Sequence, residues 1–302
     1  MKNTIDLQIQ STASDGTHTP REILVMAKDE GLHTIALTDH DTVSGVSEAR
    51  DEGAEFGIRV IPGIEFSVEE RGVHILGYGI DHTNEKLLQK LDQSRQSRIE
   101  GAKMMVENLK RRGFAVEWED ITREKTGEII ARPHIARAVM GRKENKEKLS
   151  GVQSTHDFIE RFLANDNPNY VKRRAIAARD AISLMHGAGG VAVWSHPAIH
   201  FHGNYEELEV FLKQLVGWGL NGLEAFNPSH TENDAECVHG LAHQYGLFYT
   251  AGSDFHEKGN HPADSKTGLH SARIVGDYET YGFETEHIME KLDDAMGKMK
   301  VL

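Results

Sequence analysis

The chain has 302 residues, with 34 Lys or Arg against 47 Asp or Glu, and a net charge of -13. This acidic balance argues against binding of a long nucleic-acid duplex by phosphate neutralisation, although a small phosphorylated ligand needs only a few local cations. A single cysteine excludes a disulfide framework. We find no signal-peptide core and no apolar run near the roughly 20 residues of a membrane span, which predicts a cytoplasmic protein without a membrane partner.

The first part of the chain alternates short apolar strands with helices. Thr19 and Pro20 are typical of a helix start, as N-cap and first helical residue, and Gly31 is a typical stop. Strands are expected at 4–9, 35–37, 60–65 and 73–78, and helices near 20–30 and 44–56. This rhythm predicts parallel strands joined by crossover helices.

The alternation stops between about 82 and 175, where only helices are expected. Apolar residues from Leu87 to Leu109 form the stripe of a long amphipathic helix, and shorter helices follow near 133–140 and 155–164. Beyond 175, strands at 191–194, 222–226 and 247–251 alternate with helices near 178–187, 204–217 and 232–245. We therefore predict an α/β barrel domain built from 1–81 and 176–302, interrupted by a helical insertion at 82–175.

Residue types that bind metals recur at the ends of the predicted strands. They are Asp15, His40, Glu65, His74, His196, Asp254 and His256. Strand ends of a parallel α/β barrel meet on one face, so these side chains are expected to form one metal site. A lone histidine such as His74 is more often a core residue, but seven such positions together favour the metal site. Mixed imidazole and carboxylate ligands suit Mn, Zn or Fe, and a carboxylate such as Glu65 can bridge two ions.

The segments around these residues resemble five motifs of the PHP (polymerase and histidinol phosphatase) family. They are 5–20, 36–42, 62–77, 195–197 and 252–256, so the resemblance covers nearly the whole chain. The family members most similar to it are single-domain bacterial phosphoesterases that act on AMP or 3′,5′-bisphosphates. The resemblance implies a distorted (β/α)7 barrel whose helical insertion forms a cap.

The resemblance also implies which residues bind which metal ion. Asp15, His40 and His256 resemble the ligands of one ion. Glu65, His74 and His196 resemble those of a second, with Glu65 bridging the two. Asp254 resembles a ligand of a third ion, together with two histidines of the first motif. The six residues other than His74 also resemble the catalytic set.

This chain departs from the family pattern in the first motif, where Gln8 and Gln10 stand at both histidine positions. An amide oxygen is a weaker ligand than imidazole for these metals. The third site is therefore expected to be weak or empty, while two divalent ions (Mn, Zn or Fe) still bind at the other sites.

Other residues are candidates for binding the substrate phosphate. Arg132 and His134 stand at the start of an insertion helix, where free backbone N–H groups favour anions. Lys172 and Arg173 belong to a basic cluster that either closes over the phosphate or forms a solvated face. His230 follows the sixth strand, where it could reach the ligand.

These features predict a metal-dependent phosphoesterase that uses a metal-activated water to hydrolyse a phosphomonoester of a nucleotide or short oligonucleotide. The cap is expected to exclude long polymers. Three alternatives stay open: a 5′–3′ exonuclease on short RNA or DNA, a catalytically impaired nucleotide-binding protein that lacks the two histidines, and a histidinol phosphate phosphatase. His196 and His230 are candidates for the general acid, although a metal-bound His196 is unsuited to that role.

Overall fold

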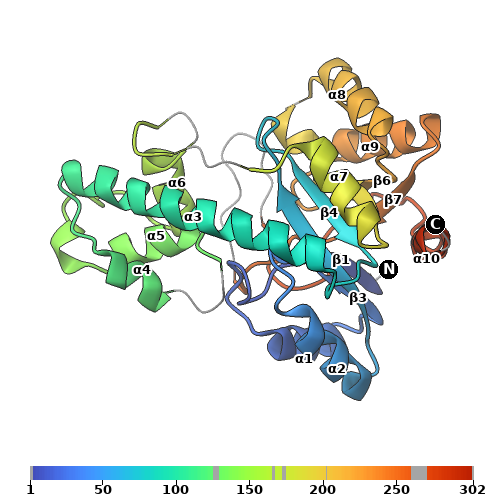
Figure 1. Cartoon of the computed structure of the whole chain (residues 1–302), viewed down its shortest axis with the longest axis horizontal. Helices are drawn as coiled ribbons and strands as arrows, with labels where there is room; N and C mark the ends of the chain where they lie inside the picture. The colour runs from blue at the N-terminus through green and yellow to red at the C-terminus, as the bar shows by residue number, and fades with distance from the viewer. Residues whose placement is uncertain are drawn as a thin grey trace.

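Seven strands form one sheet in the computed structural model, which describes residues 3–124, 129–164, 167–171, 175–201, 203–259 and 271–300. They follow the order of the chain: β1 (Ile5–Ile9), β2 (Thr34–Leu37), β3 (Arg59–Ser67), β4 (His74–Tyr78), β5 (Val191–Trp194), β6 (Gly222–Phe226) and β7 (Phe248–Ala251). The segment after β7 returns to β1, where the Gln10 backbone N–H donates to the Phe255 carbonyl at 2.9 Å. The sheet is therefore a nearly closed barrel, as predicted (Figure 1).

One strand runs against the predicted direction. The pairs β1–β2, β2–β3, β5–β6 and β6–β7 are parallel, but β4 is antiparallel to both β3 and β5. The prediction of parallel strands is wrong here because Ser67 and His74 are joined by a short turn, and a parallel crossover needs a dozen or more residues. The reversal has a useful consequence: His74 begins its strand at the rim where the neighbouring strands end.

Besides the long helix of the insertion, six helices of the described residues pack on the barrel. They are α1 (Pro20–Asp29), α2 (Val46–Phe56), α7 (Ala178–Gly187), α8 (Tyr205–Gly217), α9 (Glu232–Gln244) and α10 (Ile288–Met299). Thr19 caps α1 in a capping box with Glu22, as the sequence indicates. Five of these helices match the predicted ones, and α10 is an addition.

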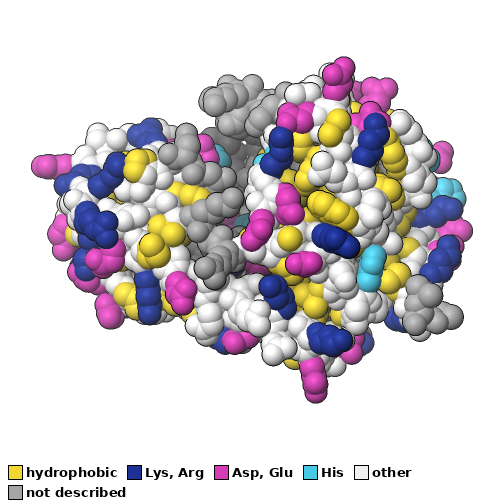
Figure 2. Space-filling model, turned by 45° about the horizontal axis from the view of Figure 1, so that its top comes forward, with side chains coloured by type: hydrophobic (Ala, Val, Ile, Leu, Met, Phe, Trp, Pro, Cys, Tyr) yellow, Lys and Arg dark blue, Asp and Glu magenta, His cyan; other side chains and the backbone are white. Residues whose placement is uncertain are grey.

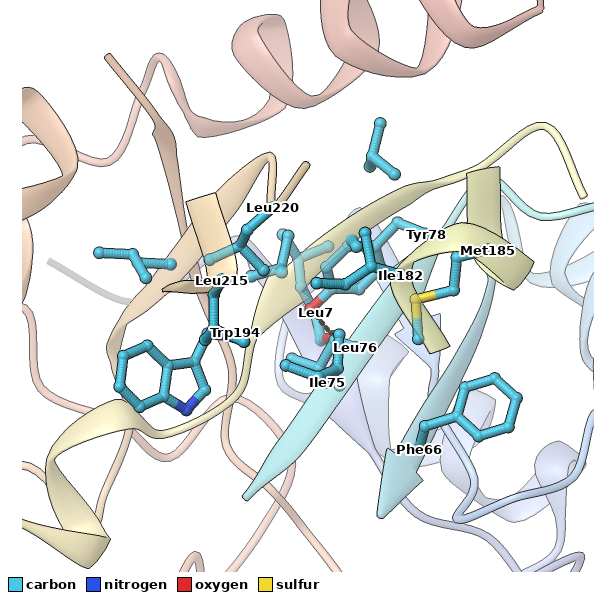
Figure 3. Close-up of a cluster of buried hydrophobic side chains, with 14 of the residues drawn as sticks. Leu7, Phe66, Ile75, Leu76, Tyr78, Ile182, Met185, Trp194, Leu215 and Leu220 are labelled. Atoms are coloured by element: carbon cyan, nitrogen blue, oxygen red, sulfur yellow. Dashed lines mark hydrogen bonds between the residues drawn. The ribbon is translucent and has the colours of Figure 1, made fainter. Parts of the chain in front are cut away.

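The barrel core consists of strand residues packed against the surrounding helices (Figure 3). Trp194 of β5 and Tyr78 of β4 are fully buried, and the Tyr78 hydroxyl donates to the Leu7 carbonyl at 2.8 Å. Met185 of α7 packs in the same cluster. Burial of both faces explains why the strands read as near-continuous apolar runs.

The insertion contains α3 (Glu85–Arg111), α4 (Trp118–Glu124), α5 (Arg132–Met140) and α6 (Thr155–Phe162), with the short helix η1 (Lys143–Asn145). It has a hydrophobic cluster of its own, which includes Leu109 and Phe158. The long α3 belongs to both parts, because Leu87 and Leu91 near its start pack in the barrel core. Figure 1 shows α3 running from the sheet to the other insertion helices.

Figure 2 shows acidic and basic side chains interspersed on the face of the molecule that it presents. Across the residues that the structure describes, no helix combines the length and the apolar character that a membrane span requires.

Candidate metal centre

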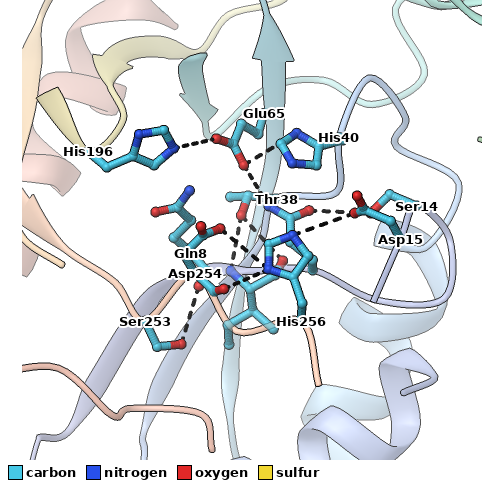
Figure 4. A network of polar contacts seen from close by, with 12 residues as sticks. Gln8, Ser14, Asp15, Thr38, His40, Glu65, His196, Ser253, Asp254 and His256 are labelled. Carbon is cyan, nitrogen blue, oxygen red and sulfur yellow. Dashed lines mark hydrogen bonds and ion pairs between the residues drawn. The ribbon is translucent and has the colours of Figure 1, made fainter. Parts of the chain in front are cut away.

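Glu65 is the hub of the candidate site (Figure 4). It is fully buried on β3, with Oε1 at 2.8 Å from His74 Nδ1 and 3.3 Å from His196 Nε2. Its Oε2 lies 3.6 Å from His40 Nδ1. Burial alone would raise the pKa of Glu65, but the neighbouring His40 and His74 outweigh it and hold that pKa well below its usual range. Glu65 is therefore an ionised carboxylate surrounded by imidazoles.

Strand register explains this convergence. His40, just beyond β2, forms a parallel bridge with Glu65, so the two backbones run side by side. On the other side of β3, Ser67 pairs with His74 in the antiparallel hairpin, which makes His74 a diagonal neighbour of Glu65. Three elements thus bring their side chains to one point.

A second group lies beside the first. His256 Nε2 is 3.6 Å from Asp15 Oδ1, and His256 Nδ1 is 3.9 Å from Asp254 Oδ1. Burial would lower the pKa of His256, but the carboxylates of Asp254 and Asp15 raise it to about 9. Burial likewise would raise the pKa of Asp15, whereas His40 and His256 lower it to about 2. Unlike charges thus hold this group together.

A tight turn presents Asp15 to this group. The Gly16 backbone N–H donates to the Ser11 carbonyl at 3.0 Å. A Cβ atom at Gly16 would lie 2.3 Å from the Gln10 carbonyl oxygen, so only glycine fits. Gly16 is therefore required by the packing of the turn that carries Asp15.

The residues present fit divalent cations. There are two sets of candidate ligands, in each of which the ligand atoms lie within 4.8 Å of one another, and both sets include His40. The sets are Asp15, His40 and His256, and His40, Glu65 and His74. Four buried ligand atoms have no hydrogen-bond partner among the described residues: Asp15 Oδ1, His40 Nδ1, His196 Nδ1 and Asp254 Oδ1. Buried polar atoms are normally satisfied, so these atoms are well suited to hold metal ions.

The backbone at the site is strained. Five non-glycine residues in the described ranges have a positive φ angle, and three of them lie here: Asp41 at 51°, His196 at 30° and Asp254 at 50°. Hydrogen bonds hold two of these conformations, from the Asp41 N–H to the Glu65 carbonyl at 2.9 Å and from the His196 N–H to Glu224 Oε2 at 2.8 Å. Strained residues concentrate at functional sites, where the surroundings fix them.

Both first-motif glutamines lie next to Glu65. Gln10 Nε2 donates to Glu65 Oε2 at 2.6 Å. Gln8 Nε2 donates to Ser195 Oγ at 2.9 Å, and that hydroxyl donates to Glu65 Oε1 at 3.1 Å. The two amides therefore bond to the centre through their nitrogen atoms.

The predicted phosphate-binding residues of the insertion lie in different places. His134 is fully buried in the first turn of α5, where its Nδ1 accepts from the Ala131 N–H at 3.0 Å. It is close enough to contribute to the low pKa of Asp15. Arg132 instead lies over the ring of Tyr170 at 5.5 Å and donates to the Leu163 carbonyl at 3.2 Å. Phosphate binding by either residue stays a prediction, and Lys172 and Arg173 lie outside the described residues.

His230 has backbone partners at both ring nitrogens. Its Nδ1 lies 2.9 Å from the Ala225 carbonyl, and its Nε2 accepts from the Ala198 N–H at 3.4 Å. Burial lowers the pKa of His230 to about 4. These contacts favour a neutral ring that supports the short helix η2 (Pro197–His200) after His196, rather than a substrate ligand or general acid.

Sequence reasoning did not find an ion pair that joins the insertion to the site. Arg98 of α3 is 8% exposed, and its Nε donates to Asp41 Oδ2 at 2.8 Å. The same guanidinium donates to Ser67 Oγ at 3.3 Å. The sequence does contain one indication of this pair: Arg98 is a charged residue seven positions after Leu91, within the apolar stripe of α3.

The fold and this site define a hydrolytic metal centre at the mouth of an α/β barrel. A family model described as "PHP domain" matches residues 6–216. The chain therefore belongs to the PHP family, and it is a metal-dependent phosphoesterase.

Its relatives share most of their length with it. A 3′,5′-nucleoside bisphosphate phosphatase of Chromobacterium violaceum is 32% identical over 84% of this chain and 88% of the relative. A 5′-3′ exoribonuclease of Haemophilus influenzae is 29% identical over 85% of this chain and 91% of the relative. A solved structure from Bifidobacterium adolescentis, assigned as a metal-dependent phosphoesterase, has a TM-score of 0.75 and 28% identity, with 88% and 92% of the two chains covered.

Proposed function

We propose that this protein hydrolyses a phosphomonoester of a small nucleotide, of the AMP or 3′,5′-bisphosphate type. The observation that carries the proposal is the pair of ligand sets around Glu65 that share His40. Adjacent divalent ions suit phosphoryl transfer, because they bind phosphate oxygens, activate a water and offset developing negative charge. The bisphosphate phosphatase relative supports the substrate class.

We assign the two ions as the family resemblance implies, and the distances from Glu65 to His74 and His196 support the second set. Asp15, His40 and His256 would hold one ion, and Glu65, His74 and His196 the other, with Glu65 between them. Imidazole and carboxylate donors favour Mn, Zn or Fe. The chain's own contribution is to fix these donors before any ion binds, since the strained backbone and the buried hydrogen bonds leave their side chains little freedom.

The insertion is proposed to act as a cap over this centre. We assign the barrel domain to 1–81 and 176–302 and the cap to 82–175. One contact and one electrostatic interaction support a close relation between cap and site: Arg98 reaches Asp41, next to His40, and His134 helps to lower the pKa of Asp15. A cap placed there would admit a nucleotide or short oligonucleotide and exclude a long strand.

Phosphate release from a panel of nucleotides tests the proposal. AMP, 3′,5′-bisphosphates and histidinol phosphate would be incubated with the protein and Mn²⁺. The expected result is release from the nucleotides, lost on Glu65→Gln and retained in the matched exposed control Glu290→Gln, on α10. Turnover of histidinol phosphate alone, or nucleotide binding without turnover, would reject the proposal.

A 5′–3′ exonuclease activity on short RNA is the second candidate, favoured by the exoribonuclease relative. A length series of 5′-phosphorylated oligonucleotides separates the two. A nucleotidase loses activity as the substrate lengthens, because the cap limits access. Stepwise shortening of the longer members would favour the exonuclease.

A further inference from the structure

The carboxylate of Glu65 receives hydrogen bonds on both oxygens from the positions where the family pattern has histidines. Gln10 Nε2 donates directly to Oε2 at 2.6 Å. Gln8 acts through Ser195, whose hydroxyl accepts from Gln8 Nε2 at 2.9 Å and donates to Oε1 at 3.1 Å. Gln8, Gln10, Ser195 and Glu65 are all fully buried.

The direction of each amide is fixed by its partners. An ionised carboxylate only accepts, so Gln10 must present its NH₂ group to Glu65. The Ser195 hydroxyl donates its one proton to a hydrogen bond with Glu65, and it therefore accepts the hydrogen bond from Gln8. On the other side, Gln8 Oε1 accepts from Asn227 Nδ2 at 3.1 Å, and Gln10 Oε1 lies 3.3 Å from Ser14 Oγ.

The only metal-binding atom of each glutamine thus points away from Glu65. A cation at the third site would need Oε1 of both glutamines to turn toward it. That turn would break the bond of Gln10 with Glu65 and the bond of Gln8 with Asn227. The amide protons already provide positive charge where a cation would otherwise lie. Hydrogen bonds to an ionised group are stronger than those between neutral groups, so the arrangement is stable without an ion.

We propose that Gln8 and Gln10 replace the third metal ion of the family pattern by positioning Glu65 through hydrogen bonds. We call Gln8, Gln10, Ser195 and Asn227 the amide clamp. The clamp holds the Glu65 carboxylate toward His74 and His196, as the third ion would otherwise do. It lowers the number of ions that the centre binds by one. This inference rests on the proposed metal assignment at Glu65, but not on the identity of the substrate.

The first test counts metal ions in purified protein loaded with Mn²⁺ and freed of excess metal. The double variant Gln8→His, Gln10→His is expected to bind one more ion per chain than the unchanged protein. Gln93→His, on the exposed face of α3, is the control and should leave the count unchanged. An equal count in the double variant and the unchanged protein would overturn the inference.

The second test measures coupling between Gln10 and Glu65 in chelator-treated protein. Gln10→Met keeps the side-chain length and removes the donor, and it should lower the unfolding temperature by about 2–4 °C. The same change in a Glu65→Gln background should have a much smaller effect, because the charge that the donor serves is gone. Equal losses in both backgrounds would overturn the inference, since packing alone would explain them.

Where Gln10→Met does not fold, Gln8→Met replaces it in the same cycle, one bond further from Glu65.

The two proposals fail separately. An ion count and a coupling as expected, without phosphate release from any nucleotide, would reject the proposed function and leave the clamp intact. Phosphate release from nucleotides, with an ion count that the double variant does not change, would reject the clamp and leave the proposed function intact.

Discussion

Removal of Arg98 should destabilise the protein strongly, although it lies in the insertion. Its guanidinium and the carboxylate of Asp41 have side-chain exposures of 7% and 4%, so water cannot take the place of either partner. In Arg98→Met, Asp41 would keep the hydrogen bond from the Ser67 N–H at 3.2 Å and would lose the buried guanidinium of Arg98. Breaking a buried pair at one side lowers the free energy of unfolding by about 3–5 kcal/mol.

Urea unfolding of the chelator-treated protein measures this loss without a contribution from bound metal. The exposed pair Arg59–Asp293 gives the matched control, because its side chains are 48% and 42% exposed. Arg59→Met should change the free energy of unfolding by about 0–1 kcal/mol. A loss of that small size for Arg98→Met would refute the reasoning. Addition of Asp41→Asn to Arg98→Met should recover part of the loss, since it removes the buried charge that had paired with Arg98.

Two further predictions concern the metal site. In the metal-free protein the pKa of His256 is raised from 6.5 to about 9, so the stability from this proton is complete below about pH 6.5 and is lost as the pH rises through about 9. A metal ion must displace that proton, so the affinity for Mn²⁺ should rise with pH up to about pH 9. Calorimetry in buffers of different ionisation enthalpy would measure the proton release. An affinity that stays constant between about pH 7 and 9 would contradict this. Gly16→Ala should lower the free energy of unfolding by about 1–3 kcal/mol, because its Cβ would lie 2.3 Å from the Gln10 carbonyl oxygen. The control is Gly187→Ala in α7, where nothing lies within 4 Å, and equal thermal unfolding of the two variants would disprove the steric account.

The sequence was sufficient to predict which residues gather at the rim, because strand ends are a local property. Asp15, His40, Glu65 and His256 each follow or end a predicted strand, and the barrel brings those ends together. The direction of β4 was also available in principle. Its connection from β3 is too short for a crossover, and a turn of that length forces an antiparallel pair.

Other features depend on contacts between distant parts of the chain. The helix α10 repeats Ile288, Leu292 and Met296 at four-residue spacing, which is a helical pattern that the prediction left unused. The Arg98–Asp41 pair joins positions 57 residues apart. A charged residue in an apolar stripe signals that it has a buried partner, but the partner is set only when α3 packs on the barrel.

The glutamines of the first motif show why residue type alone does not settle the chemistry of a site. An amide carries a donor and an acceptor on the same carbon, and the sequence cannot say which one faces inward. Read as ligands, Gln8 and Gln10 are two weak oxygen donors at a damaged metal site. In the structure, Glu65 sets the orientation of the Gln10 amide. Its ionised carboxylate can only accept hydrogen bonds, so the NH₂ group of Gln10 faces it. On the proposal made above, the two glutamines lower the number of bound ions by one and keep the partial positive charge of their amide protons on the side of Glu65.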